Sequence, residues 1–229
     1  MKVIKKQITF EDIKSNEEIS IYIKKGNDLL GIMGYTEHGF AHAGKVAEKA
    51  AEILHNLDYP ERTVELAKIA GYLHDIGNCV NRNAHAQSGA VMAFRILDRM
   101  GFDAEELADI VGAVGNHDEE TGMAVSPVSA ALILADKSDV RRSRVRKKNR
   151  NAAKLMADIH DRVNYAVYKS TLRLNDEKTS ALLELEIDTE ISAVMEYFEI
   201  FLTRMTMCRN AAAFLGLSFE LNINNVRLL

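Results

Sequence analysis

The chain has 229 residues, of which 47% are apolar, so it is long enough for one domain, or one domain with an appendage, around a sizeable core. Its formal net charge of −4 excludes no class of partner, but its two cysteines are too few for a disulfide-stapled secreted protein. Because no segment resembles a signal-peptide core or a membrane-spanning helix, we expect a cytoplasmic protein with no membrane partner.

The apolar pattern divides the chain into three parts. Residues 1–34 predict a helical lead-in, and residues 35–164 keep the apolar spacing of consecutive helices. From residue 165 the pattern changes, and residues 183–188 alternate strictly between apolar and acidic, as a half-buried strand does. The expected fold is therefore mainly α, with a helical bundle at 35–164 and a small α+β appendage at 165–229.

The appendage is expected to contain antiparallel strands and one long helix. The segment "VYKSTLRLNDEKTSALLELEID" predicts two strands around a polar turn. Thr189 is a candidate N-cap for the long helix, which Gly216 would end, and "LSFELNINNVRLL" predicts a last strand. Because the appendage contains no histidine, we expect it to supply dimer contacts or a wall of a pocket, and no chemistry.

Five consecutive predicted helices of the middle part each carry an imidazole or a carboxylate on the apolar stripe. A single histidine on such a stripe is most often a core residue with one hydrogen bond. Six buried polar groups need a shared partner, because each would otherwise lose several kcal/mol of solvation. We therefore predict a common metal site for these six residues: His42, His74, Asp75, His85, His117 and Asp136.

The ligand types restrict the metal. Imidazoles and carboxylates without thiolates favour iron, manganese, zinc or nickel over an oxygen-preferring ion such as calcium. Six candidate ligands exceed the four of a closed structural zinc site, so two divalent ions bridged by Asp75 fit better than one. We expect iron or manganese first, with zinc, nickel or magnesium as alternatives.

The spacing of these residues resembles a known signature. His42, the pair His74-Asp75, and Asp136 are similar to the H…HD…D pattern of the HD superfamily of metal-dependent phosphohydrolases, and "LHDIGN" is similar to its central motif. The similarity covers roughly residues 35–145. His85 and His117 match the extra histidines of the two-metal subset, such as HD-type diadenosine tetraphosphate hydrolases and HD-GYP phosphodiesterases.

The resemblance implies a ligand set for each ion. His42, His74, Asp75 and Asp136 would hold one, and Asp75, His85 and His117 would hold the other. Two departures argue against cyclic di-GMP as substrate: Asn78 stands where HD-GYP proteins have lysine, and Asp118 stands where they have a second histidine.

Several residues beside these ligands are candidates for substrate binding. His38 would face the substrate or the surface, and Asn78 would bind a phosphate oxygen or cap a helix end. The run "DKSDVRRSRVRKKNR" at 136–150 has eight basic and two acidic residues, a net charge of +6. It predicts either a solvated helix face or a phosphate clamp, because arginine forms bidentate bonds with phosphate.

A continuing helix would place Lys137, Arg141 and Arg144 on one side. Lys137 would then lie near the reacting phosphate, and Arg141 and Arg144 would bind more distal parts of the substrate. Asp75 and Lys137 are accordingly the candidate catalytic residues.

The expected activity is hydrolysis of a phosphate ester or anhydride of a nucleotide, or of another small phosphorylated metabolite, by a metal-activated hydroxide. Two alternatives stay open: a non-catalytic signalling or scaffold module, and an RNA- or other nucleic-acid-binding phosphodiesterase that uses residues 141–150. An HD oxygenase with a di-iron site is more remote. Nucleic acid is the less favoured partner, because no aromatic residues interleave with the basic ones.

Overall fold

The computed structural model describes residues 7–229, which are mostly helical. The α-helices are, in chain order, α1 (Phe10–Lys14), α2 (Glu17–Met33), α3 (Phe40–Asn56), α4 (Glu61–Leu73), α5 (His85–Met100), α6 (Ala104–Gly115), α7 (Pro127–Ser138), α8 (Ala152–Ala157), α9 (Ile159–Ala166) and α10 (Val194–Phe214). Short 3₁₀ helices are η1 (Ile76–Cys79), η2 (Arg142–Arg144) and η3 (Lys147–Asn149). The strands are β1 (Val167–Leu174), β2 (Ser180–Ile187), β3 (Ser218–Ile223) and β4 (Val226–Arg227). Within this range no helix is long and apolar enough to cross a membrane.

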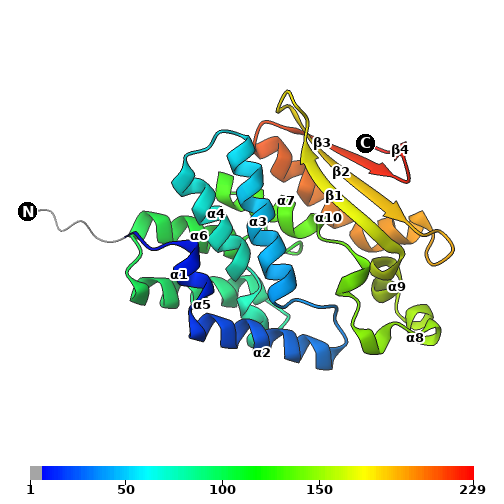
Figure 1. The fold of residues 1–229 in the computed structure, drawn as a ribbon, viewed down its shortest axis with the longest axis horizontal. Helices are drawn as coiled ribbons and strands as arrows, with labels where there is room; N and C mark the ends of the chain where they lie inside the picture. Colours follow the sequence, from blue (N-terminus) through cyan, green and yellow to red (C-terminus); the bar gives the residue numbers. More distant parts are fainter. Residues whose placement is uncertain (1–6) are drawn as a thin grey trace, which may run out of the picture.

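The helical part packs around α3, α4 and α7, and α7 also contacts α10 of the appendage (Figure 1). Val46, Ile69 and Leu132 are fully buried and belong to the core that these helices share. Gly71 permits the close contact between α3 and α4, because a Cβ there would lie 2.7 Å from the Cα of Ala47. This packing holds α3, α4 and α7 in a fixed arrangement, and the polar residues at their ends form the site described below.

The predicted lead-in corresponds to α1 and α2, and its residues 1–6 lie outside the described range. Thr9 and Asp12 form a capping box that starts α1, and the side chain of Asn16 caps α2. Gly34 ends α2 in the left-handed conformation, with a φ of 93°. Because α2 packs against η1, the lead-in supports the segment that follows Asp75.

The appendage is a four-stranded sheet in the order β1-β2-β3-β4, with α10 along one face (Figure 1). The expected mainly α fold with an α+β appendage is confirmed, but one detail is corrected. β1 and β2 are antiparallel, as expected, whereas β2 and β3 are parallel. The reason is the connection: α10 carries the chain back along the sheet, so β3 starts at the same end as β2.

The long helix also begins later than expected. Thr189 is not its N-cap, because Asp188 first forms a turn that accepts hydrogen bonds from the amides of Glu190 and Ile191. The helix starts at Val194. Gly216 follows its end with a φ of 77°, which fits the predicted stop.

Candidate metal centre

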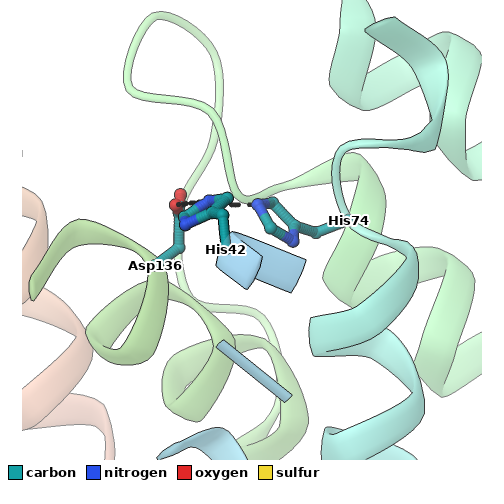
Figure 2. Close-up of side chains that lie close together, drawn as sticks. All are labelled: His42, His74 and Asp136. Carbon is teal, nitrogen blue, oxygen red and sulfur yellow. Dashed lines mark ion pairs between the residues drawn. The ribbon is translucent and has the colours of Figure 1, made fainter. Parts of the chain in front are cut away.

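Six polar side chains from five helices and the loops beside them lie close together in the helical part. They are the six predicted ligands: His42, His74, Asp75, His85, His117 and Asp136. Figure 2 shows three of them pointing toward one another from α3, the end of α4 and α7. Two positions differ from the expected stripes, because α4 ends at Leu73 and α6 ends at Gly115. His74 is the C-cap of α4 and keeps helical backbone angles, and His117 lies just beyond the end of α6.

One half of the centre is formed by His42, His74 and Asp136 together with one oxygen of Asp75. The Nε2 atom of His42 lies 3.2 Å from Asp136 Oδ1 and 3.6 Å from Asp75 Oδ2. The Nε2 atom of His74 lies 3.2 Å from Asp75 Oδ2 and 3.6 Å from Asp136 Oδ1. Two imidazoles and two carboxylate oxygens therefore face a common point.

The other oxygen of Asp75 faces a second pair of histidines. Its Oδ1 atom lies 3.4 Å from His85 Nε2 and 4.0 Å from His117 Nε2. These two Nε2 atoms are 3.1 Å apart. The carboxylate of Asp75 thus lies between two groups of ligand atoms, with one oxygen toward each.

Every histidine of the centre is oriented through its other ring nitrogen. The Nδ1 atoms of His74, His85 and His117 donate to backbone carbonyls of Gly71, Arg82 and Val114, at 2.8, 3.0 and 2.7 Å. His42 instead pairs with a carboxylate, because its Nδ1 lies 2.8 Å from Asp139 Oδ2. With the proton held on Nδ1, each Nε2 directs its lone pair into the centre, which is the usual arrangement of metal-binding histidines.

Unsatisfied polar atoms show that the centre fits a cation. Three buried atoms, His42 Nε2, His74 Nε2 and Asp75 Oδ2, have no hydrogen-bond partner among the described residues. Their close approaches to one another fall outside hydrogen-bond geometry, and leaving such atoms unpaired in the interior is costly. A divalent ion would satisfy all three. The donor set of imidazole nitrogens and carboxylate oxygens suits such an ion.

Neighbouring charges set the protonation states at the centre. Burial disfavours the charged form of His74, but the carboxylates of Asp75 and Asp136 raise its pKa to about 10. Burial also opposes ionisation of Asp136, yet the Lys137 ammonium and His74 hold the pKa of that carboxyl well below its usual range. Burial keeps the pKa of His117 well below its ordinary value. Carboxylates that stay charged and a neutral His117 are ready to bind a cation, whereas His74 must first release a proton.

Comparison with known families agrees with this geometry. The family model of the HD domain matches residues 39–141, a segment that contains all six predicted ligands. This segment of the chain is an HD domain. The resemblance seen in the sequence is confirmed at the level of the domain family. HD domains bind divalent metal ions, and the His/Asp groups of this chain could hold such an ion.

Two proteins are similar to this HD-domain chain. MJ1020 of Methanocaldococcus jannaschii, an uncharacterized protein, is 25% identical over 194 residues, covering 75% of this chain and 73% of that protein. A crystal structure from an uncultured Thermotogales bacterium, described as a predicted HD superfamily hydrolase, is 28% identical with a TM-score of 0.43. It covers 54% of this chain and 67% of its own.

A cavity of about 440 Å³ opens beside the six predicted ligands of the HD domain. Its lining includes four of the predicted substrate or catalytic residues: His38, Asp75, Lys137 and Arg144. His38 precedes α3, so it shares no helix with His42, and its Nδ1 is held at 2.8 Å by the carbonyl of Thr36. Lys137 is buried, with its Nζ 2.7 Å from Asp136 Oδ2.

Asn78 is not placed as a phosphate contact. It is buried, and its amide donates to the Oδ1 and the backbone carbonyl of Asp75, at 2.7 and 3.0 Å. The Asn78 amide is thereby used on Asp75, with one hydrogen bond to its carboxylate and one to its backbone carbonyl. Gly77 beside it allows η1 to approach α5, because a Cβ there would lie 2.0 Å from the carbonyl oxygen of His85.

The continuing helix expected for the basic run is wrong. α7 ends at Ser138, and Asp139 leaves the helical conformation, so Lys137, Arg141 and Arg144 do not share a helix face. Arg141 pairs with Asp139 at 2.7 Å and is absent from the cavity lining. Arg144 borders the cavity, but it is buried and donates to the backbone carbonyls of Glu37 and Asp139.

Other cations of the basic run bind backbone carbonyls. Arg146 donates to the carbonyls of Asn27, Tyr35 and Thr36, around the end of α2, and Lys148 donates to that of Gly31. These cations therefore satisfy carbonyl groups at the C-terminal end of α2, a position that favours positive charge.

Sequence reasoning missed several residues that border the centre. Asp139 lies three positions after Asp136 in the same motif, so its spacing was an available signal for the residue that orients His42. Glu119 and Arg204 also line the cavity. Arg204 comes from α10 of the appendage, and no local pattern links it to the HD domain.

Proposed function

We propose that this protein is a metal-dependent phosphohydrolase that cleaves a phosphate ester or anhydride of a nucleotide or another small phosphorylated metabolite. The observation that carries the proposal is the place of Asp75, whose two oxygens face two separate sets of histidine nitrogens. A carboxylate between two ligand groups is the arrangement that a pair of ions needs. Paired ions are typical of enzymes that act on phosphate groups.

His42, His74, Asp75 and Asp136 would hold one ion, and Asp75, His85 and His117 would hold the other. When bound, divalent ions lower the pKa of coordinated water and offset negative charge on phosphoryl oxygens. Iron or manganese is our first expectation for their identity. The contribution of Asp139 and of the three backbone carbonyls is to keep each imidazole turned toward the ions.

Lys137 would bind a phosphoryl oxygen. Its Nζ is bonded to Asp136 Oδ2 and lies 3.4 Å from Glu119 Oε1, and an ammonium has three hydrogens to donate. Burial lowers the pKa of Lys137, but the two carboxylates more than compensate and raise it, so the group carries its charge at neutral pH. The cavity volume of about 440 Å³ suits a small ligand.

The arrangement of the basic run bears on the alternatives. The guanidinium groups of Arg144, Arg146 and Arg150 donate to backbone carbonyls, so they are less available to neutralise a nucleic-acid backbone. A small phosphorylated substrate therefore has the better support. A homodimer and a cytoplasmic location are further expectations.

Metal analysis and substrate screening test the proposal. Protein purified without chelators, and supplied with manganese or iron, should hydrolyse at least one member of a panel of phosphomonoesters, nucleotides and dinucleoside polyphosphates. Asp75→Ala should lose bound metal and activity. The matched control is Asp176→Ala, because Asp176 is exposed in the turn between β1 and β2, and it should keep both. A parent protein that binds two ions yet hydrolyses nothing on the panel would favour the non-catalytic alternative.

A further inference from the structure

The long helix of the appendage brings an arginine to the metal centre. α10 packs against α7, the helix that carries Asp136 and Lys137. From it, Arg204 extends toward the HD domain, and its Nε donates to Glu119 Oε1 at 2.8 Å. The same Glu119 oxygen lies 3.4 Å from Lys137 Nζ, which in turn lies 2.7 Å from Asp136 Oδ2. A chain of alternating charges thus connects the appendage to a proposed metal ligand.

The guanidinium of Arg204 is fixed at one edge and open at the other. Its Cζ lies 4.4 Å from the ring centre of Phe201, so the group stacks on an aromatic side chain while its Nε is bonded to Glu119. Within residues 7–229 its two terminal nitrogens have no hydrogen-bond partner. The side chain keeps 20% of its surface exposed and lines the cavity. The two terminal nitrogens are therefore available for a ligand in the cavity.

Other arginines near the cavity are used differently. Arg144 donates through Nε and through one terminal nitrogen to backbone carbonyls. Arg82 lies over Tyr35 and directs one terminal nitrogen toward Asn78 and His85. Arg204 is held at Nε by a single carboxylate, and both of its terminal nitrogens stay available. A planar pair of donors is the group that matches two oxygens of a phosphate.

We propose that Arg204 binds non-bridging oxygens of the substrate's phosphoryl group, and that Glu119 is its positioning residue. The α+β appendage then completes the phosphate site of the HD domain, which goes beyond the wall or dimer contact expected from the sequence. This inference rests on the proposed function, and it adds a substrate contact from outside the HD-domain segment.

Binding of inorganic phosphate to the metal-loaded protein tests the proposal independently of turnover. Isothermal titration calorimetry would compare the parent with Arg204→Ala, Arg204→Lys and Arg209→Ala. Arg209 is the matched control, because it lies on the same helix and is exposed. We expect Arg204→Ala to raise the phosphate Kd at least about tenfold, as loss of a charge-assisted hydrogen bond does, with metal content unchanged. Arg209→Ala should match the parent.

The lysine variant separates substrate binding from structural support. Arg204→Lys keeps a charge beside Glu119 but removes the planar pair of donors, so we expect parent-like thermal stability and a Kd raised several-fold. It also replaces Arg204→Ala if that variant does not fold. In turnover of p-nitrophenyl phosphate, Arg204→Lys should raise KM more than it lowers kcat.

Two results would overturn the inference. The first is that Arg204→Ala, or a folded Arg204→Lys, binds phosphate as tightly as the parent. If the parent still hydrolyses a substrate in that case, the proposed function is unaffected. The other is a metal-loaded parent that does not bind phosphate. If the parent binds phosphate through Arg204 but hydrolyses no substrate, the proposed function fails and the anion site remains.

Discussion

Asp139 offers a direct test of how the HD-domain centre is organised, because it touches one ligand and is itself outside the ligand set. Its Oδ2 lies 2.8 Å from His42 Nδ1, and its Oδ1 accepts a hydrogen bond of 2.7 Å from Arg141 Nε. Burial opposes its ionisation, but His42 and nearby arginines lower the pKa of the Asp139 carboxyl. At neutral pH, the carboxylate therefore orients the imidazole.

Replacing Asp139 by alanine removes that support. Loss of a group that orients a metal-binding histidine typically lowers metal affinity about 10- to 100-fold. This range corresponds to about 1.4 to 2.8 kcal/mol of binding free energy. Asp139→Asn should lose less, because its amide oxygen still accepts from Nδ1. Titration of the metal-free variants with manganese or zinc, in competition with a chelating dye, gives the affinities.

The control for this prediction is Arg141→Ala. This variant removes the ion pair between Arg141 and Asp139 but leaves the Asp139 carboxylate beside His42. The metal affinity of the variant should therefore stay within about twofold of the parent. If Asp139→Ala binds metal as tightly as the parent, or if Arg141→Ala loses as much affinity, Asp139 does not act through His42.

Three further predictions follow from contacts at and around the centre. Gly77→Ala should destabilise the fold by about 2 kcal/mol or more and lower metal occupancy beside His85, because the added Cβ would lie 2.0 Å from the His85 carbonyl oxygen. Thermal melting and metal analysis measure the two effects. A variant with the stability and the metal content of the parent would contradict the prediction. Metal binding should release about one proton near pH 7, since the pKa of His74 is about 10 without metal, and metal affinity should rise with pH up to about 10. Calorimetry in buffers of different ionisation enthalpy measures the number of protons released. Metal binding without proton release would contradict the prediction. Arg146→Ala should lower stability by about 1.5 to 3 kcal/mol, because the guanidinium donates to three backbone carbonyls, with KM unchanged; a raised KM at parent stability would indicate a phosphate clamp instead.

The sequence was sufficient to predict that the six polar side chains lie close together, because a polar residue on the apolar stripe of a predicted helix is visible in the local pattern. His42 and Asp136 each stand on an apolar stripe that has the spacing of a helix. Such a stripe can be recognised from one or two helical turns of sequence. Helix ends were harder to place, which is why His74 and His117 lie just beyond the helices expected to carry them. The metal roles of these residues remain predictions.

The basic run was harder to interpret, because the partners of its cations are backbone carbonyls of a distant segment. Arg146 contacts Asn27 and Tyr35, which lie more than a hundred positions earlier, and carbonyl groups carry no sequence signal. The position of Arg204 was equally hidden, because it depends on how α10 packs on α7. The parallel pairing of β2 and β3 was within reach, since a long helix between two strands permits that direction.

The most direct test of the central claim is anomalous diffraction at the manganese edge from crystals of the protein grown with manganese. We expect two anomalous peaks, one on each side of the Asp75 carboxylate, the first beside His42, His74 and Asp136 and the second beside His85 and His117. A single peak among His42, His74 and Asp136, with His85 and His117 bare at saturating manganese, would contradict the two-ion centre.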